Sequence, residues 1–255
     1  MFLTQRFWAH LDGLLSEIFG YTACNPPLPM NVPKMIFHAV LLLAFLPLAL
    51  VGLILCTIVT LIFPQKFSRI SGFSTPKKLG NGTEFTVLTG NVCLMPECLS
   101  RVNNLPNTLT RAEGIARRLA APGVRELKND IETELPEPDV ICLQEVFNEP
   151  AWTILNNTLK SKFENILFDA HQVWLSPMHF TACNSGLWIA SKYEILRSEF
   201  YPYHDAYLED ALCCKGLLLV ELDLGNDESI ILGNTHLQAP TADHIKCKYH
   251  EEIDV

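Results

Sequence analysis

The chain has 255 residues, a formal net charge of −9 and an apolar fraction of 49%. This length allows one sizeable domain with a small appendage, and the acidic balance argues against a nucleic-acid partner, because nucleic-acid-binding surfaces are usually basic. The nine cysteines form no CxxC pair, so the usual zinc-ligand spacing is absent. Their odd number and apolar surroundings indicate reduced thiols facing the cytosol rather than a disulfide framework.

The N-terminal part of the chain carries two apolar segments of different character. Residues 2–21 place apolar side chains at helical spacing among scattered charges, which predicts an amphipathic helix at a membrane interface. A proline-rich hinge follows over residues 25–33. Residues 36–63 contain no Asp, Glu, Lys or Arg and exceed the roughly 20 residues that a bilayer-spanning helix needs. Pro47 leaves open a re-entrant hairpin of two shorter helices, and a buried core helix is the third alternative.

The charges around the apolar segment predict its orientation. Lys66, Arg69, Lys77 and Lys78 follow the segment, whereas only Lys34 lies close before it. The positive-inside tendency therefore places the downstream domain in the cytosol, on a membrane-associated protein. The same basic residues would favour contact with anionic phospholipid.

From about Gly80 the pattern changes to strands and polar helices, which is typical of an α/β or α+β domain. We expect a strand over 84–93, a helix over 107–121 capped by Thr108 or Thr110, a strand over 139–146 and a helix over 149–163. Five further strands are then expected in a row, over residues 165–170, 185–192, 194–202, 215–224 and 228–237.

Three of the predicted strands end on a polar residue that can bind a metal ion or a phosphate group. The apolar runs of these strands close on Asn91, Glu145 and His236, and ligands in open sheets collect outside strand ends. Glu145 closes the run "DVICLQEV", where an unpaired buried carboxylate would be costly. An Asn and a Glu together suit Mg²⁺, which prefers oxygen ligands, and a nearby His can donate a hydrogen bond to a phosphoryl oxygen. The sequence therefore predicts metal-assisted phosphoester hydrolysis, although it shows no general base for the attacking water.

With these residues in place, the chain resembles the DNase I-like endonuclease/exonuclease/phosphatase superfamily, and within it the large membrane-bound neutral sphingomyelinases. The stretches that carry the resemblance are "NVCLMPECLSRVNNL" (91–105), "CLQEVF" (142–147), "CNSGLWIASKYEI" (183–195), "EDALCCKG" (209–216) and "THLQAP" (235–240). The resemblance implies an α/β fold in which a membrane region, residues 1–80, precedes an incomplete DNase I-like four-layer sandwich over residues 81–247. Residues 248–255 are expected to form a divergent tail.

The resemblance also implies roles for individual residues. Glu145 matches the magnesium-binding glutamate, Asn91 an asparagine that positions metal and phosphate, and His236 a histidine that hydrogen-bonds the phosphate. Asn184 matches a residue at the entrance of the active site. Asp210 and Lys215 match a pair thought to switch the site between inactive and active arrangements, and the alternative for them is an ordinary surface ion pair.

The sequence departs from the family in two places, one that bears on the type of relative and one that bears on the expected activity. The short connection over residues 120–138 is similar to that of the mitochondria-associated type. In the family, "THLQAP" is followed by a "GDFN" motif and then by a "DH" strand that supplies the catalytic base. The sequence contains no "GDFN", and its remaining candidates, His244 and His250, stand in the wrong context for that base. We therefore expect a truncated chain with weak or no hydrolase activity.

The function implied by the resemblance is magnesium-dependent hydrolysis of sphingomyelin to ceramide and phosphocholine. A membrane anchor suits an enzyme whose substrate lies in the bilayer. Two alternatives remain: another phosphodiesterase or phosphatase activity of the superfamily, such as on inositol phosphates or DNA, and a non-catalytic membrane-associated fragment that binds lipid.

Overall fold

A computed structural model gives the structure of the chain. It describes residues 2–22, 24, 27, 29–62, 67–72, 76–78, 84–122, 126–128, 131–133, 136–169, 174–175, 180–181, 183–203 and 212–238. The expected boundary near residue 80 and the expected tail over residues 248–255 lie outside these ranges.

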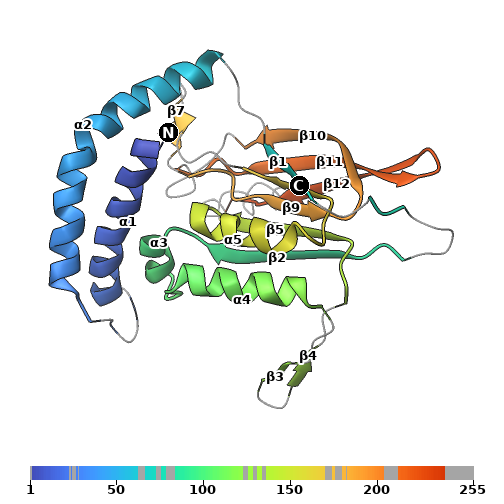
Figure 1. Cartoon of the computed structure of the whole chain (residues 1–255), viewed down its shortest axis with the longest axis horizontal. Helices are drawn as coiled ribbons and strands as arrows, with labels where there is room; N and C mark the ends of the chain where they lie inside the picture. The colour runs from blue at the N-terminus through green and yellow to red at the C-terminus, as the bar shows by residue number, and fades with distance from the viewer. Residues whose placement is uncertain are drawn as a thin grey trace, which may run out of the picture.

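Two long helices form the N-terminal part of the structure and lie against each other (Figure 1). Helix α1 (Phe2–Thr22) confirms the first predicted helix. Helix α2 (Val32–Ile62) runs through Pro47 as one helix that bends, so the re-entrant hairpin is not the arrangement observed. A proline removes one backbone hydrogen bond and bends a helix without ending it when neighbouring turns hold. Over Val32–Gly52, α2 is long and apolar enough to cross a membrane.

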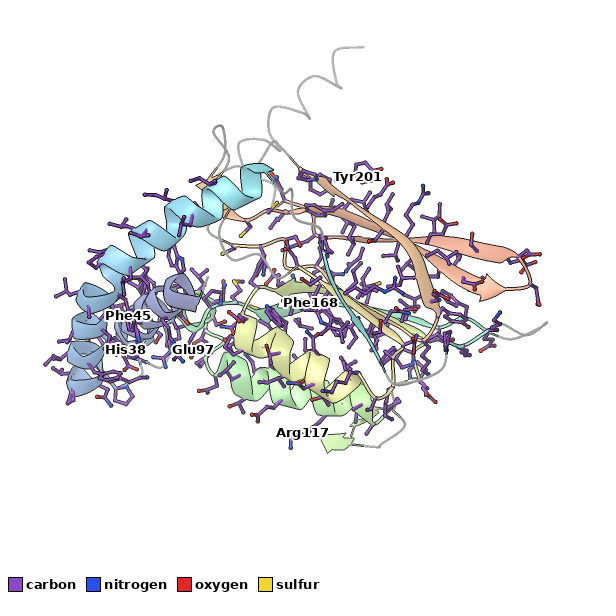
Figure 2. The ribbon with its side chains drawn as sticks, turned by 45° about the horizontal axis from the view of Figure 1, so that its top comes forward. His38, Phe45, Glu97, Arg117, Phe168 and Tyr201 are labelled. Atoms are coloured by element: carbon purple, nitrogen blue, oxygen red, sulfur yellow. The ribbon has the colours of Figure 1, made fainter. Side chains whose placement is uncertain are left out.

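The contact between the two helices is partly aromatic and partly ionic. The ring of Phe45 on α2 stacks on His10 of α1 at a centroid distance of 5.8 Å, and His38 and Phe45 lie on the side of α2 that faces α1 (Figure 2). The Nζ of Lys34 lies 2.6 Å from the buried carboxylate of Glu17. The remaining surface of α2 exposes large apolar side chains along much of its length. A long exposed apolar surface of this kind is typical of contact with a membrane or with another protein.

Helix α1 is joined to the rest of the protein through helix α3 (Glu97–Val102). Pro96, the N-cap of α3, makes no side-chain cap bond. Instead the carboxylate of Asp12 on α1 accepts hydrogen bonds from the backbone N–H groups of Glu97 (3.0 Å) and Cys98 (2.7 Å). A carboxylate at this position satisfies free N–H groups and interacts favourably with the helix dipole.

Replacing Asp12 with Ala is expected to destabilise α3 by about 1 kcal/mol, the usual cost of losing an N-cap. Hydrogen exchange should show faster exchange at the amides of Glu97 and Cys98. Asp12→Asn keeps an acceptor oxygen and should retain most of the protection. Unchanged exchange in Asp12→Ala would show that this contact does not hold α3.

The larger sheet has five strands in the order β1-β6-β9-β5-β2. The strands are β1 (Ser68–Ser71), β2 (Val87–Leu94), β5 (Val140–Val146), β6 (Asn165–Phe168) and β9 (Trp188–Ser191). Strands β2 and β5 are parallel, and the other neighbours are antiparallel. Because β2 and β5 run in the same direction, their carboxyl ends lie at the same edge of the sheet.

Helices α4 (Thr108–Ala120) and α5 (Glu149–Leu159) cover one face of this sheet (Figure 1). The predicted cap of α4 was wrong: Asn107 is its N-cap, in the left-handed conformation, and makes no side-chain cap bond. The carboxylate of Glu97 accepts hydrogen bonds from the N–H groups of Asn107 and Thr108 instead. Glu97, the first residue of α3, therefore links the start of α3 to the start of α4, and it is labelled in Figure 2.

The smaller sheet packs on the other face of the larger one. Its antiparallel strands are β10 (Glu194–Pro202), β11 (Gly216–Gly225) and β12 (Glu228–Thr235). Leu218, Val220 and Leu222 of β11 point inward against Val140 and Ile189 of the larger sheet, and all five are buried. Two short hairpins complete the described elements: β3 (Glu126–Lys128) with β4 (Ile131–Thr133), and β7 (Trp174–Leu175) with β8 (Phe180–Thr181).

The expected α/β sandwich is thus confirmed, with a layer of helices, the larger sheet and the smaller sheet in sequence. The predicted strands and helices from residue 84 onward correspond to observed elements, with ends displaced by a few residues. Strands β1, β3, β4, β7 and β8 and helix α3 were not predicted. All of these elements are short, and such segments give little periodic signal.

Candidate metal centre

A bulge at the end of β2 and a residue with positive φ near the end of β5 build the candidate site. Asn91 is the partner of Gln144 and Leu94 the partner of Val146, so two residues of β2 oppose the single residue Glu145 of β5. Glu145 has a φ of 62°, in the left-handed region. Bulges redirect side chains at sheet edges, and a non-glycine residue at positive φ often marks a functional position. Together they turn the Glu145 carboxylate away from the hydrophobic core.

The three predicted polar residues meet at this point. The Nδ2 of Asn91 donates a hydrogen bond to Oε1 of Glu145 over 2.6 Å. The Nε2 of His236, directly after β12, lies 3.4 Å from the same oxygen. The side chains of Glu145 and His236 are 15% and 13% exposed, so the cluster is sheltered but reachable from solvent. The convergence expected of Asn91, Glu145 and His236 is therefore present, while their chemical roles stay predictions.

The neighbours of Glu145 keep its carboxylate ionised. Burial on its own raises the pKa of Glu145, but hydrogen bonds from His236 and Asn91 outweigh this effect and hold the pKa below its ordinary value. Burial and the negative charge of Glu145 raise the pKa of the adjacent Cys93 thiol. At neutral pH the cluster thus offers an anionic oxygen and no thiolate from Cys93.

A second layer of polar side chains fixes the strand ends behind Glu145. Asn234 of β12 is 2% exposed. Its Nδ2 donates to the backbone oxygens of Leu143 (3.1 Å) and Trp188 (3.2 Å), and its Oδ1 accepts from Nε2 of Gln144 over 2.7 Å. Asn234 therefore joins the two sheets. It lies two residues before His236 in the chain, and its partner Gln144 directly precedes Glu145. The sequence pattern did not single out Asn234, although it stands directly before the stretch "THLQAP" (235–240).

Asn184 lies behind the site rather than at its surface in this structure. It is 2% exposed, and its Nδ2 donates to the backbone oxygens of Asp169 (3.1 Å) and Phe147 (3.4 Å). The ring of Phe147 in turn lies 6.3 Å from that of His236 between centroids. Asn184 thus supports Phe147, and its expected position at the entrance stays a prediction.

The structure describes one residue of the expected switch pair. Asp210 lies outside the described residues. Lys215 is 6% exposed, and its Nζ donates a hydrogen bond to the backbone oxygen of Leu237 over 3.4 Å. Lys215 is therefore buried beside the segment that follows β12, whereas the pairing of Asp210 with Lys215 is untested.

The donors at this site fit Mg²⁺. No cluster of three or more His, Cys, Asp or Glu side chains that could hold a metal occurs among the described residues. Mg²⁺ does not need one, because it keeps several waters and is often bound through one or two carboxylates and substrate phosphate. The ionised Glu145 supplies the carboxylate, and the Asn91 side chain supplies an amide oxygen that also accepts the backbone N–H of Cys93 over 3.1 Å.

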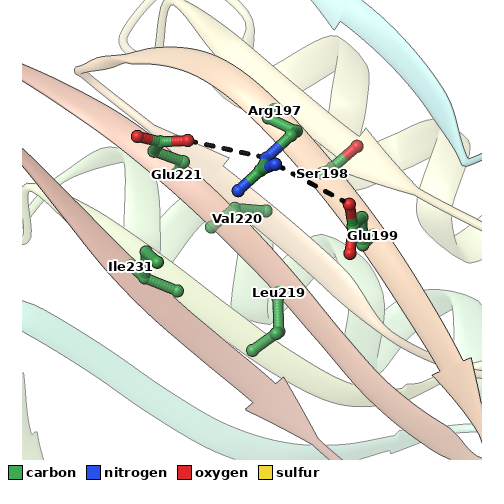
Figure 3. A pocket seen from close by; sticks show the side chains of 7 residues that line it. All are labelled: Arg197, Ser198, Glu199, Leu219, Val220, Glu221 and Ile231. Carbon is green, nitrogen blue, oxygen red and sulfur yellow. Dashed lines mark ion pairs between the residues drawn. The ribbon is translucent and has the colours of Figure 1, made fainter.

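A different surface feature lies on the outer face of the smaller sheet (Figure 3). Arg197 lines this shallow hollow of about 40 Å³ and forms ion pairs with Glu221 (3.6 Å) and Glu199 (4.0 Å). The ion pairs are solvent-exposed and of the kind that contributes little to stability. None of the three candidate site residues lines it.

Comparison with known proteins finds one matching protein family and relatives that are sphingomyelin phosphodiesterases. The sequence model of the Endonuclease/Exonuclease/phosphatase family matches residues 102–234. Sphingomyelin phosphodiesterase 5 of Mus musculus is 35% identical over 185 residues, which are 64% of this chain and 38% of that protein. Sphingomyelin phosphodiesterase 3 of Homo sapiens is 37% identical over 116 residues, 43% of this chain and 18% of that protein. The chain thus spans well under half the length of these relatives.

Solved structures match more distantly. Sphingomyelinase C from Streptomyces griseocarneus gives a TM-score of 0.44 at 24% identity, covering 62% of this chain and 50% of that one. A beta toxin variant from Staphylococcus aureus, whose structure holds bound magnesium ions, gives 0.44 at 19% identity, covering 63% and 51%.

Proposed function

Because the chain belongs to the Endonuclease/Exonuclease/phosphatase family, we propose that it carries the metal-binding part of a magnesium-dependent sphingomyelin phosphodiesterase. The reaction is hydrolysis of sphingomyelin by water to ceramide and phosphocholine. The convergence of Asn91 and His236 on the Glu145 carboxylate is the observation that carries the proposal. The similarity to curated sphingomyelin phosphodiesterases supports the choice of substrate.

Each of the three residues has a distinct task in this proposal. Mg²⁺, when bound, would neutralise negative charge that develops on the phosphate oxygens. Glu145 would hold the ion through its carboxylate, and Asn91 keeps that carboxylate oriented through its 2.6 Å hydrogen bond. The Nε2 of His236 faces the same space and would donate a hydrogen bond to a phosphoryl oxygen.

The membrane location follows from the same proposal. Helix α2 would place the site close to a substrate that lies in the bilayer, with the domain after residue 80 on the cytosolic side. Anionic phospholipid would add a weaker attraction, because two of the basic residues are engaged within the fold. Arg69 donates to Oδ1 of Asn165 and to the oxygen of Ile195, and Lys77 pairs with the buried carboxylate of Asp139 over 2.5 Å.

The substrate class can be tested with the headgroup itself. Calorimetry with the purified chain in detergent should detect binding of phosphocholine in the presence of Mg²⁺ and not in EDTA. His236→Ala should weaken this binding about 10-fold or more, because a hydrogen bond to a charged phosphate is lost. Tighter Mg²⁺-dependent binding of inositol phosphate or of an abasic DNA oligonucleotide would contradict the sphingomyelin assignment and favour another activity of the family.

A further inference from the structure

Two cysteines lie side by side outside the candidate metal centre. Cys183 and Cys213 are partners in an isolated parallel β-bridge. The N–H of Cys183 donates to the oxygen of Leu212 over 2.9 Å, and the N–H of Cys214 donates to the oxygen of Cys183 over 3.3 Å. Neighbouring strands lie about 4.8 Å apart, and a disulfide accepts Cα separations from about 4.4 to 6.8 Å. The backbone therefore already holds the two residues at a spacing that a disulfide accepts.

The pKa of Cys183 is shifted in the opposite direction from the pKa of Cys142 and of Cys214. Neither Cys183 nor Cys213 is part of a disulfide, and both are half-buried. A hydrogen bond from Cys213 lowers the pKa of Cys183, although burial acts in the opposite direction. Burial raises the pKa of Cys142 and of Cys214 to about 12. Because the thiolate is the form that peroxides oxidise, peroxide is expected to oxidise Cys183 before Cys142 and Cys214.

We propose that Cys183 and Cys213 form a reversible disulfide when the chain meets hydrogen peroxide. The sulfur of Cys183 attacks one peroxide oxygen, the O–O bond breaks, and a sulfenic acid forms at Cys183 while hydroxide leaves and takes a proton to become water. The sulfur of Cys213, having lost its proton, then attacks the sulfenic sulfur, the S–O bond breaks and a second water leaves. In total two thiols are oxidised by two electrons, and one peroxide is reduced to two waters.

The position of the bond gives it a structural consequence. Cys213 stands three residues before Gly216, whose oxygen accepts the backbone N–H of His236 over 3.3 Å. Cys183 precedes Asn184, whose side chain holds the oxygen of Phe147. The disulfide would therefore fasten the segment that supports His236 to the segment that supports Phe147. Any effect on catalysis rests on the proposed function, whereas formation of the bond does not.

Peptide mapping of the full 255-residue chain tests the proposal. The reduced chain in detergent is exposed to graded hydrogen peroxide, alkylated, digested with trypsin and analysed without reductant. Trypsin places Cys183 in the peptide 163–192 and Cys213 with Cys214 in the peptide 198–215. The expected product is these two peptides joined, two hydrogens lighter than their sum and separated again by dithiothreitol. Oxidation should also raise Tm, by roughly 5–10 °C, because the link restricts the unfolded chain.

Two variants identify the bond. Cys214→Ser is the matched control and should still form the linked peptides, whereas Cys213→Ser should not. In Cys213→Ser, peroxide should instead leave a sulfenic acid at Cys183 that dimedone traps, provided that its Tm before oxidation matches that of Cys214→Ser. Linked peptides that persist in Cys213→Ser, or full alkylation of Cys183 and Cys213 in the oxidised natural chain, would overturn the proposal.

Discussion

Replacing Glu145 with Gln is expected to weaken Mg²⁺ binding by at least about 100-fold, which exceeds the usual effect of changing a residue behind a metal ligand. Gln keeps the size and the hydrogen-bonding shape of Glu but removes the negative charge that Mg²⁺ requires. The fold should survive, because the side chain lies at a strand end and is 15% exposed rather than packed in the core. Calorimetric titration of the purified chain with Mg²⁺ measures the change in affinity, and Tm shows whether the folded state keeps its stability.

The matched control is Glu113→Gln, the same charge change on an exposed residue of α4. This control should bind Mg²⁺ as the natural chain does. Glu145→Gln with an affinity equal to that of Glu113→Gln would show that the ion binds elsewhere. Loss of binding together with a large fall in Tm would instead assign Glu145 a structural role.

Replacing Asn234 with Ala is expected to cost about 2–4 kcal/mol of unfolding free energy, because several buried groups lose their hydrogen bonds at once. The backbone oxygens of Leu143 and Trp188 and the amide of Gln144 would all lose this partner. Tm should fall by about 5–15 °C. Mg²⁺ affinity should fall about 10-fold or more as well, because Asn234 fixes the strand that leads into Glu145.

Asn157→Ala provides the comparison for this prediction. Asn157 is an exposed residue of α5 whose Oδ1 accepts one hydrogen bond, from Nζ of Lys160 over 3.3 Å. Replacing Asn157 with Ala should change Tm and Mg²⁺ affinity very little. If Asn234→Ala behaves like Asn157→Ala in both measurements, the hydrogen bonds of Asn234 do not hold the sheets together.

Sequence patterns predicted the parts of the site that stand at strand ends. Glu145 and His236 each follow a run of apolar residues, and Asn91 stands in such a strand. The parallel pairing of β2 with β5 explains why Asn91 and Glu145 meet. The approach of His236 depends on the packing of one sheet on the other, which periodicity alone does not give.

Contacts between segments that are distant in the chain could not be predicted from the sequence pattern. Asp12 caps a helix 85 residues away, and Glu97 replaces the predicted threonine cap of α4. Gln144 and Asn234 are both polar residues in apolar strands, yet only the packed sheets show that they pair across 90 residues of chain. Such pairings depend on tertiary structure, and local preference does not determine them.

The most direct test of the site is to locate the bound ion. Crystals of the chain soaked with Mn²⁺, an anomalous scatterer that takes similar oxygen ligands, should show an anomalous peak within bonding distance of the Glu145 carboxylate and close to Asn91. The peak should be absent in Glu145→Gln crystals soaked in the same way. A Mn²⁺ peak at other residues, with none at Glu145 at a concentration that saturates binding, would contradict the assignment of this cluster as the metal centre.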